Sequence, residues 1–196
     1  VMRQGRRVLA SQPLEVVEIG ATVTAAESAP AGSLIAVDWD GPAYDGDYIA
    51  VAEPDAEAGQ YIAYTYTREG SPLLLRLPIE PGDYELRYVA TGSGRTVLGA
   101  QAVTTELVSA TIDAPAQAPA GGNIALTWEG PDYEGDYIAL FKAGEDRYRQ
   151  YIYTSKDSPM VMTLPEGPGA YELRYITRQG ERVLATHALE ATYAPE

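Results

Sequence analysis

The stretch WDGPAYDGDYIAV at residues 39–51 returns almost unchanged as WEGPDYEGDYIAL at residues 128–140. A catalytic centre is rarely needed twice in one chain, whereas a building unit is commonly repeated. Self-similarity at a spacing of nearly ninety residues is typical of tandem domains and is too long for the units of a solenoid. The repeat therefore indicates that this protein is assembled from copies of one folded unit.

Three further segments recur in the same order. They are AGSLIAVDW (31–39) with AGGNIALTW (120–128), SPLLLRLP (71–78) with SPMVMTLP (158–165), and PGDYELRY (81–88) with PGAYELRY (168–175). A chain of 196 residues is long enough for two small domains, each with its own core. We therefore predict two repeats, at residues 19–107 and 108–196, joined without a flexible Gly/Ser linker around residues 105–110.

The front of the chain resembles the end of a repeat. MRQGRRVLASQPLEV (2–16) matches TRQGERVLATHALEA (177–191) and, more loosely, TGSGRTVLGAQAVTT (91–105). Residues 1–18 are accordingly expected to be the terminal strand or strands of a preceding repeat, and the chain to be a piece of a longer array.

Short alternating or β-branched runs are separated by Gly, Pro, Asp and Ser clusters at the spacing expected of a β-sandwich. The sequence predicts seven strands in each repeat and no helix. In the first repeat they fall near 20–27, 33–39, 47–53, 60–67, 72–77, 83–90 and 95–104. In the second they fall near 109–114, 123–128, 136–142, 149–154, 159–164, 170–177 and 181–192. The predicted fold class is all-β, as tandem immunoglobulin-like or fibronectin III-like sandwiches.

Alternation along GDYELRYVA (82–90) separates an apolar face from a charged one. The tyrosines and the leucine are expected to meet Ile35, Trp39 and Ile49 in the core, while Glu85 and Arg87 form cross-strand charge partners on a solvated face. Tyr84 and Tyr171 follow a Pro-Gly pair, as in the tyrosine corner of Greek-key sandwiches, where the hydroxyl closes onto nearby backbone.

Charge and composition exclude several classes of protein. The net charge is -14, both repeats are acidic, and neither offers the basic surface that nucleic acid or anionic lipid requires. No apolar run is long enough for membrane insertion. The absence of cysteine removes disulfides, thiolate metal sites and cysteine nucleophiles.

Four carboxylates in and immediately before the first copy of the duplicated stretch raise the question of calcium, which prefers several oxygen ligands from such loops. They are Asp38, Asp40, Asp45 and Asp47, and the second repeat has Thr127, Glu129, Glu134 and Asp136 in their places. The alternative is a solvated turn set by glycine and proline and anchored by Asp47 or Asp136. The sequence leaves both interpretations open, and we assign no metal ligand.

Catalytic and cofactor-binding residues are not predicted. His187 is the single histidine, and its counterparts are Gln101 and Gln12, so no acid–base role is shared between the repeats. Serines without a nearby histidine have no base to activate them. The chain is therefore predicted not to be an enzyme and to need no cofactor.

Fifteen tyrosines stand against one phenylalanine, and several gather in QYIAYTYT (60–67) and QYIYTS (150–155), on what should be an edge-side strand. Tyrosine suits a half-wet surface because its ring packs while its hydroxyl stays hydrated. The two interpretations are stacking against sugar rings and ordinary packing on the sheet or between domains.

Together, W-[DE]-G-P-x-Y-x-G-D-Y-I, the S-P and L-P pairs, P-G-x-Y-E-L-R-Y and the closing R-x-V-L-A resemble bacterial immunoglobulin-like tandem repeats that follow von Willebrand A domains in extracytoplasmic proteobacterial proteins. This resemblance covers residues 19–196 and the partial unit before them. It implies a cell-envelope or secreted protein, periplasmic, surface-bound or released, in which the sandwiches carry or present another domain.

The predicted function is a non-catalytic spacer and interaction module that contacts a protein partner or neighbouring repeats. One alternative is a ligand-binding module for calcium or carbohydrate. Another is a subunit that polymerises when residues 6–18 add as a strand to another copy.

Overall fold

The computed structural model describes residues 11–13, 17–92 and 94–193. Across these ranges the regular elements are strands and two single-turn 3-10 helices, η1 (Thr67–Glu69) and η2 (Thr154–Lys156). None of the helices in this part of the chain could span a membrane.

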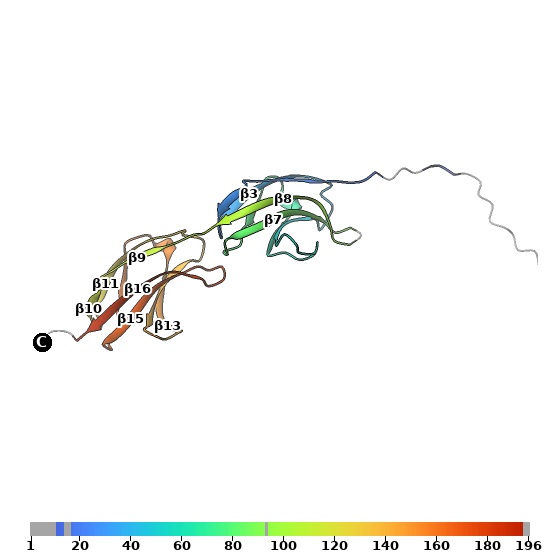
Figure 1. Cartoon of the computed structure of the whole chain (residues 1–196). Coiled ribbons are helices and arrows are strands. Elements are labelled where there is room, and N and C mark those ends of the chain that lie inside the picture. Colours follow the sequence, from blue (N-terminus) through green and yellow to red (C-terminus); the bar gives the residue numbers. More distant parts are fainter. Residues whose placement is uncertain (1–10, 14–16, 93, 194–196) are drawn as a thin grey trace, which may run out of the picture.

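The first half of the chain folds into two facing sheets (Figure 1). One sheet has the order β1-β3-β6, and the other has the order β2-β8-β7-β4-β5. The strands are β1 (Thr22–Thr24), β2 (Ser28–Pro30), β3 (Leu34–Asp40), β4 (Tyr48–Ala52), β5 (Ala63–Tyr66), β6 (Leu73–Arg76), β7 (Gly82–Ala90) and β8 (Thr96–Glu106). We call this the first sandwich.

The second half repeats the arrangement strand for strand, with sheets β14-β11-β9 and β10-β16-β15-β12-β13. The strands are β9 (Thr111–Asp113), β10 (Gln117–Pro119), β11 (Asn123–Glu129), β12 (Tyr137–Lys142), β13 (Tyr148–Tyr153), β14 (Met160–Thr163), β15 (Gly169–Ile176) and β16 (Val183–Thr192). We call this the second sandwich. Two facing sheets of mainly antiparallel strands with this order form an immunoglobulin- or fibronectin III-like fold, which confirms the predicted fold class.

The opening strand of each sandwich differs from the prediction. A single strand was expected over 20–27 and over 109–114, but the chain forms two short strands there and changes sheet between them. β1 pairs antiparallel with β3, whereas β2 runs parallel to β8. The second sandwich does the same with β9 and β10. A strand of three residues is too short to show a hydrophobic alternation in the sequence. Which sheet it joins therefore depends on the strands that it meets in the folded protein.

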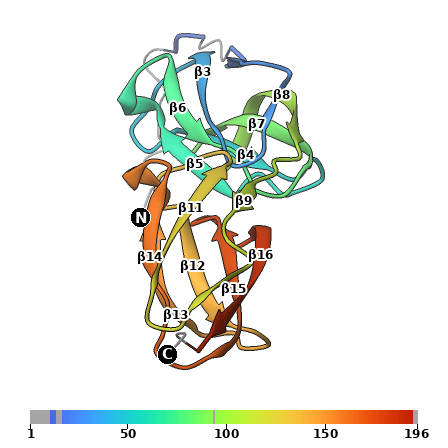
Figure 2. The same ribbon diagram turned by 90° about the vertical axis from the view of Figure 1, so that its left-hand side faces the viewer.

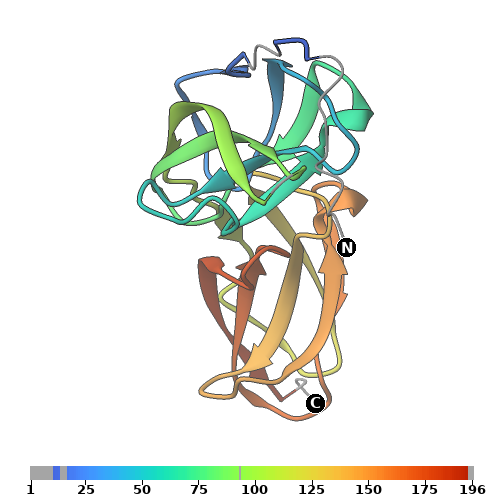
Figure 3. The ribbon, with the colours of Figure 1, turned by 90° about the vertical axis from the view of Figure 1, so that its right-hand side faces the viewer.

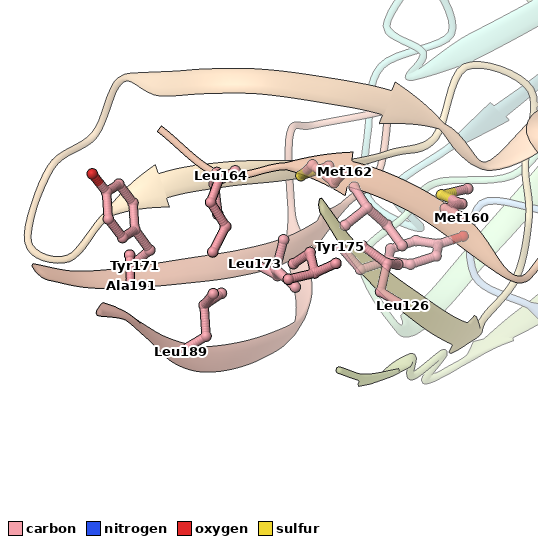
Figure 4. Close-up of a cluster of buried hydrophobic side chains, with 12 residues drawn as sticks. Leu126, Met160, Met162, Leu164, Tyr171, Leu173, Tyr175, Leu189 and Ala191 are labelled. Carbon is pink, nitrogen blue, oxygen red and sulfur yellow. The ribbon is translucent and has the colours of Figure 1, made fainter. Parts of the chain in front are cut away.

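The predicted core alternation is confirmed. Tyr84, Leu86 and Tyr88 are buried with Ile49, while Ile35 and Trp39 pack at the margin of the same cluster. The second sandwich holds an equivalent cluster, shown in Figure 4, whose members are Ile124, Leu126, Ile138, Leu140, Met160, Met162, Leu164, Tyr171, Leu173, Tyr175, Leu189 and Ala191. Each fully buried leucine or isoleucine stabilises its sandwich by about 2 kcal/mol.

The prediction of a solvated face at Glu85 and Arg87 is wrong for the arginine. The Arg87 side chain is 6% exposed, and its guanidinium bonds Glu85 on its own strand at 2.8 Å. It also donates to the carbonyls of Glu53, Pro54 and Ala56 at 3.1, 2.6 and 2.6 Å. Because the loop between β4 and β5 folds over this face, the arginine is enclosed by backbone carbonyls that alternation along β7 could not reveal.

The two hydrophobic clusters share no residue. In Figures 2 and 3 the sandwiches follow one another end to end, and residues 107–110 connect β8 to β9. The repeat limits at 19–107 and 108–196 stay predictions. The strand expected within 1–18 lies almost wholly outside the described residues.

Candidate interaction surfaces

The duplicated stretch forms a locked loop in the first sandwich. Asp47, the residue before β4, is 1% exposed. One of its carboxylate oxygens accepts hydrogen bonds from the Tyr88 hydroxyl at 3.0 Å and the Tyr44 backbone N–H at 3.1 Å. The other accepts one from the Thr91 N–H at 2.9 Å. The carboxylate therefore fastens the 41–47 loop to β7, which confirms the predicted anchoring role.

The second sandwich repeats this network. Asp136 accepts hydrogen bonds from the Tyr175 hydroxyl at 3.0 Å, the Tyr133 N–H at 3.1 Å and the Arg178 N–H at 3.0 Å. The Tyr175 ring lies so close to Gly130 that a Cβ added to this glycine would come within 2.8 Å of the ring. Packing and hydrogen bonding around one buried carboxylate thus account for the recurrence of the thirteen-residue stretch, and no ligand is needed to explain it.

The candidate calcium ligands are not gathered at one point. Asp38, Asp40 and Asp45 are exposed, whereas both oxygens of Asp47 already accept hydrogen bonds. Over the residues that the structure describes, no group of three or more acidic, histidine or cysteine side chains is placed to hold a metal ion. This geometry favours the structural interpretation of the acidic loop.

His187 lies in β16 and is half-buried, and its Nε2 has no hydrogen-bond partner in the described part of the chain. Its counterpart in the first sandwich, Gln101, exchanges two hydrogen bonds with Ala25, at 3.0 and 2.9 Å. That amide fastens the crossing between β1 and β2. The position is therefore structural, and the histidine fills it less well than glutamine.

The tyrosine-rich strands are edge strands, as predicted, since β5 and β13 end their five-stranded sheets. Each contributes to a cluster of four rings on the outer face of the sheet. The first comprises Tyr48, Tyr61, Tyr64 and Tyr66, and the second comprises Tyr137, Tyr148, Tyr151 and Tyr153. We call these the first and second tyrosine clusters. Neighbouring rings meet edge to face, with centroids from 4.7 Å to 6.5 Å apart.

Register shows how closely the clusters match. Tyr48 faces Tyr66 across the β4–β5 pair, and Tyr137 faces Tyr153 across β12–β13. The rings cover small buried alanines, Ala50 and Ala139. Tyr48 is itself 5% exposed, whereas the exposed members of the two clusters are between 39% and 45% exposed, namely Tyr61, Tyr64, Tyr148, Tyr151 and Tyr153. The rings shield the outer face of the sheet from solvent, and their exposed edges and hydroxyls form an amphipathic surface.

A shallow cavity of about 240 Å³ lies beside the second tyrosine cluster, with Arg178 and Glu181 in its wall. Aromatic rings with a cation and a carboxylate beside them could contact either a polypeptide or a sugar. The carbohydrate interpretation therefore stays a prediction.

The two sandwiches meet in a contact that we call the joint. The Tyr133 hydroxyl in the second sandwich donates a hydrogen bond of 2.9 Å to the Ala31 carbonyl in the first. Its ring lies against Gly32, where an added Cβ would come within 2.8 Å of a ring carbon. Gly32 also has a φ of +78°, which favours glycine. Burial raises the pKa of the Tyr133 phenol.

The β15–β16 turn completes the joint. The Gln179 side chain donates to the Leu77 carbonyl at 3.1 Å, and Arg182 pairs with Glu80 at 2.8 Å. A cavity of about 360 Å³ beside these contacts is lined by residues of both sandwiches, including Arg76 and Arg178. The joint therefore uses neutral and charged contacts from two separate segments of the second sandwich.

Sequence reasoning missed the joint residues. Tyr133 was interpreted only as part of the repeated stretch, and Gln179 and Arg182 only as part of a matching strand end. One signal was available, because Arg178, Gln179 and Arg182 are replaced by glycine, serine and threonine at positions 92, 93 and 96 of the first repeat. A departure from the repeat at an exposed turn indicates a contact made by one copy and not by the other.

Comparison with solved structures finds chains that are weakly similar to this one. One is described as the BSP domain of a biofilm associated protein, with 10% identity over 89% of this chain, 30% of that chain and a TM-score of 0.33. A two-domain fibronectin type III segment of chicken tenascin has 12% identity over 89% of this chain and 99% of that one, with a TM-score of 0.33. The FN1–FN3 domains of chicken CNTN1 have 16% identity over 89% and 65%, with a TM-score of 0.32.

This chain spans less than a third of the biofilm-associated structure and under two thirds of the CNTN1 structure. No protein-family model matches the sequence, and neither does any curated protein. With TM-scores of 0.32 to 0.33, these similarities support no conclusion about function.

Proposed function

We propose that this chain is a non-catalytic spacer whose two sandwiches are held in a fixed relative orientation and present their tyrosine clusters to a protein partner. The observation that carries the proposal is the joint. Three side chains of the second sandwich bond the base of the first, and the connection of four residues, 107–110, leaves little slack. Flexible tandem domains have no need of such contacts.

The setting proposed for this spacer is extracytoplasmic, in a bacterial envelope or secreted protein. The resemblance of the repeats to extracytoplasmic immunoglobulin-like modules supports it. The tyrosine clusters supply the adhesive surface, since rings that are partly ordered by their neighbours lose little entropy on binding.

Distance measurement between the sandwiches tests the fixed orientation. The chain has no cysteine, so spin labels can be placed at Leu74→Cys and Val161→Cys without removing native thiols. These side chains are 57% and 63% exposed and occupy matching positions in the two sandwiches. We expect a single narrow distance distribution by pulsed electron paramagnetic resonance in dilute solution.

Tyr133→Ser should broaden this distribution, because it removes both the ring on Gly32 and the bond to Ala31. Tyr44→Ser is the matched control, since it changes the corresponding tyrosine of the first sandwich, which is outside the joint. A broad distribution in the unmodified protein would contradict the proposal, as would equal effects of the two substitutions.

A further inference from the structure

The outer end of the first sandwich carries the same tyrosine that forms the joint. Tyr44 corresponds to Tyr133 in the duplicated stretch, and its backbone N–H bonds Asp47 just as that of Tyr133 bonds Asp136, both at 3.1 Å. The two side chains thus leave equivalent locked loops. In the described structure Tyr44 is 54% exposed, whereas Tyr133 is half-buried by the first sandwich.

The surface around Tyr44 is apolar. A groove of about 320 Å³ is lined by Tyr44 together with Ile19, Pro42 and Leu98. Ile19 is 50% exposed, whereas Val108, which stands at the same place before the second sandwich, is half-buried. The face that the joint covers on the second sandwich is therefore open on the first, as far as the described residues show.

The end of the second sandwich that is distant from the joint, which we call its base, has the same backbone surface that Tyr133 contacts on the first sandwich. Ala120 and Gly121 correspond to Ala31 and Gly32, and Gly121 has a φ of +73°. The Ala31 and Ala120 N–H groups bond the last strand of their sandwich at the same distance, 2.8 Å. The Gly121 N–H bonds the Pro165 carbonyl as that of Gly32 bonds Pro78. The acceptor carbonyl and the glycine backbone are thus presented in the same way at both bases. The neighbouring side chain differs, because Glu166 stands where the first base has Ile79, and its carboxylate lies within 2.9 Å of where a Cβ on Gly121 would be. Glu166 is exposed, so a docking ring requires its side chain to turn away from the glycine.

We propose that the groove around Tyr44 docks the base of the second sandwich of another copy of this chain, with the Tyr44 hydroxyl donating to the Ala120 carbonyl and the ring lying on Gly121. The contact joins copies head to tail, since the donor and acceptor surfaces lie at opposite ends of the molecule. The proposed contact has the same geometry as the joint, and it does not depend on the proposed function of the chain as a spacer.

This contact is weaker than the joint. Thr96 and Gly167 stand where the joint has Arg182 and Glu80, so that ion pair is not reproduced. The covalent connection is also missing, and within one chain such a connection supplies an effective concentration in the millimolar range. We therefore expect association at protein concentrations of about 0.1 to 1 mM.

Sedimentation equilibrium up to about 1 mM tests the proposal. The full chain should form concentration-dependent oligomers. Tyr44→Ser and Gly121→Asn should each remain monomeric alone, because one removes the tyrosine and the other adds a side chain where the ring would lie. Asparagine tolerates the backbone conformation of Gly121, and circular dichroism confirms that each variant is folded.

Mixing the two variants gives the decisive result. The intact Tyr44 end of one variant can dock the intact base of the other, so an equimolar mixture should form a dimer that does not grow further. A monomeric full chain at the highest concentration would overturn the proposal. Association that survives both substitutions would also overturn it and indicate another surface, such as a strand within residues 6–18. Neither outcome would affect the fixed joint measured in dilute solution.

Discussion

At the scale of single residues, the two sandwiches are natural controls for each other. Position 101 holds a glutamine whose amide bonds Ala25 twice, and position 187 holds a histidine with an unpartnered nitrogen. A planar amide can donate and accept along one strand at the same time, whereas a neutral imidazole carries its donor and acceptor on opposite sides of a ring.

His187→Gln should therefore stabilise the second sandwich by about 1 kcal/mol, the usual net value of a gained hydrogen bond. Gln101→His should weaken the first sandwich by a similar amount. Urea unfolding followed by circular dichroism gives both free energies of unfolding. Ala114 is the counterpart of Ala25 in the second sandwich. Unchanged stability of His187→Gln would mean that the Ala114 backbone does not bond the introduced amide.

The buried tyrosine–carboxylate pair predicts a loss of stability at alkaline pH. Burial raises the pKa of Tyr88 to about 12, above its usual value of 10.0. Between these values the folded state keeps a proton that the unfolded chain has lost, so the stabilising contribution is complete below pH 10 and is lost as the pH rises toward 12. The decline amounts to about 3 kcal/mol for a two-unit shift.

Tyr88→Phe removes this titration, and its free energy of unfolding should fall less steeply between about pH 9.5 and 11.5 than that of the unmodified protein. The variant is less stable at pH 7, because Asp47 loses a hydrogen-bond donor. Urea midpoints measured across the pH range test the slope, and Tyr44→Phe is the control because its ring is exposed. Parallel slopes for all three proteins would show that another group controls alkaline unfolding.

At the scale of elements, the β4–β5 and β12–β13 loops are held differently by arginines at the same position. Arg87 bonds three loop carbonyls in addition to Glu85, whereas Arg174 pairs with Glu172 and lies 4.1 Å from the Phe141 ring centroid. The side chain of Arg174 is 20% exposed, against 6% for Arg87.

Arg87→Ala should cost about 3 kcal/mol of stability, since it leaves buried carbonyls without their charged donor. Arg174→Ala should cost about 1 kcal/mol, which is typical of a partly exposed ion pair. Hydrogen exchange should show lost protection in the 53–60 loop for the first variant alone. An equal loss of unfolding free energy for Arg87→Ala and Arg174→Ala would contradict the role of Arg87 in holding the loop.

At the scale of the whole molecule, the joint combines one ion pair with two neutral hydrogen bonds and a ring contact. Glu80 is 68% exposed, so its pairing with Arg182 is screened and contributes little. The bonds from Tyr133 and Gln179 are made by uncharged groups. Orientation should therefore depend on the neutral contacts.

Raising the salt concentration from about 0.05 M to about 1 M should leave the distance distribution between labels at positions 74 and 161 nearly unchanged. Arg182→Ala should broaden it slightly and Tyr133→Ser strongly. Pulsed electron paramagnetic resonance measures all three. If salt alone strongly broadened the distance distribution, the ion pair between Arg182 and Glu80 would be the contact that fixes the orientation.

The all-β class, the repeated strands, the alternating core and the anchoring role of Asp47 and Asp136 could be predicted from the amino-acid order, because these depend on local period and on the repeat. Both tyrosine corners were also predictable, and their hydroxyls bond the Glu80 and Gly167 carbonyls as expected.

Three features could be found only in the folded protein. The first strand divides between two sheets, Arg87 is enclosed by a loop, and Tyr133 packs on Gly32 of the other sandwich. Each of these depends on which backbone segment, distant in the sequence, lies close in the folded chain. A carbonyl or glycine that contacts such a side chain does not change the hydrophobic pattern of the sequence, so the contact cannot be predicted from it. The same reason explains why two nearly identical tyrosines, 44 and 133, have different surroundings.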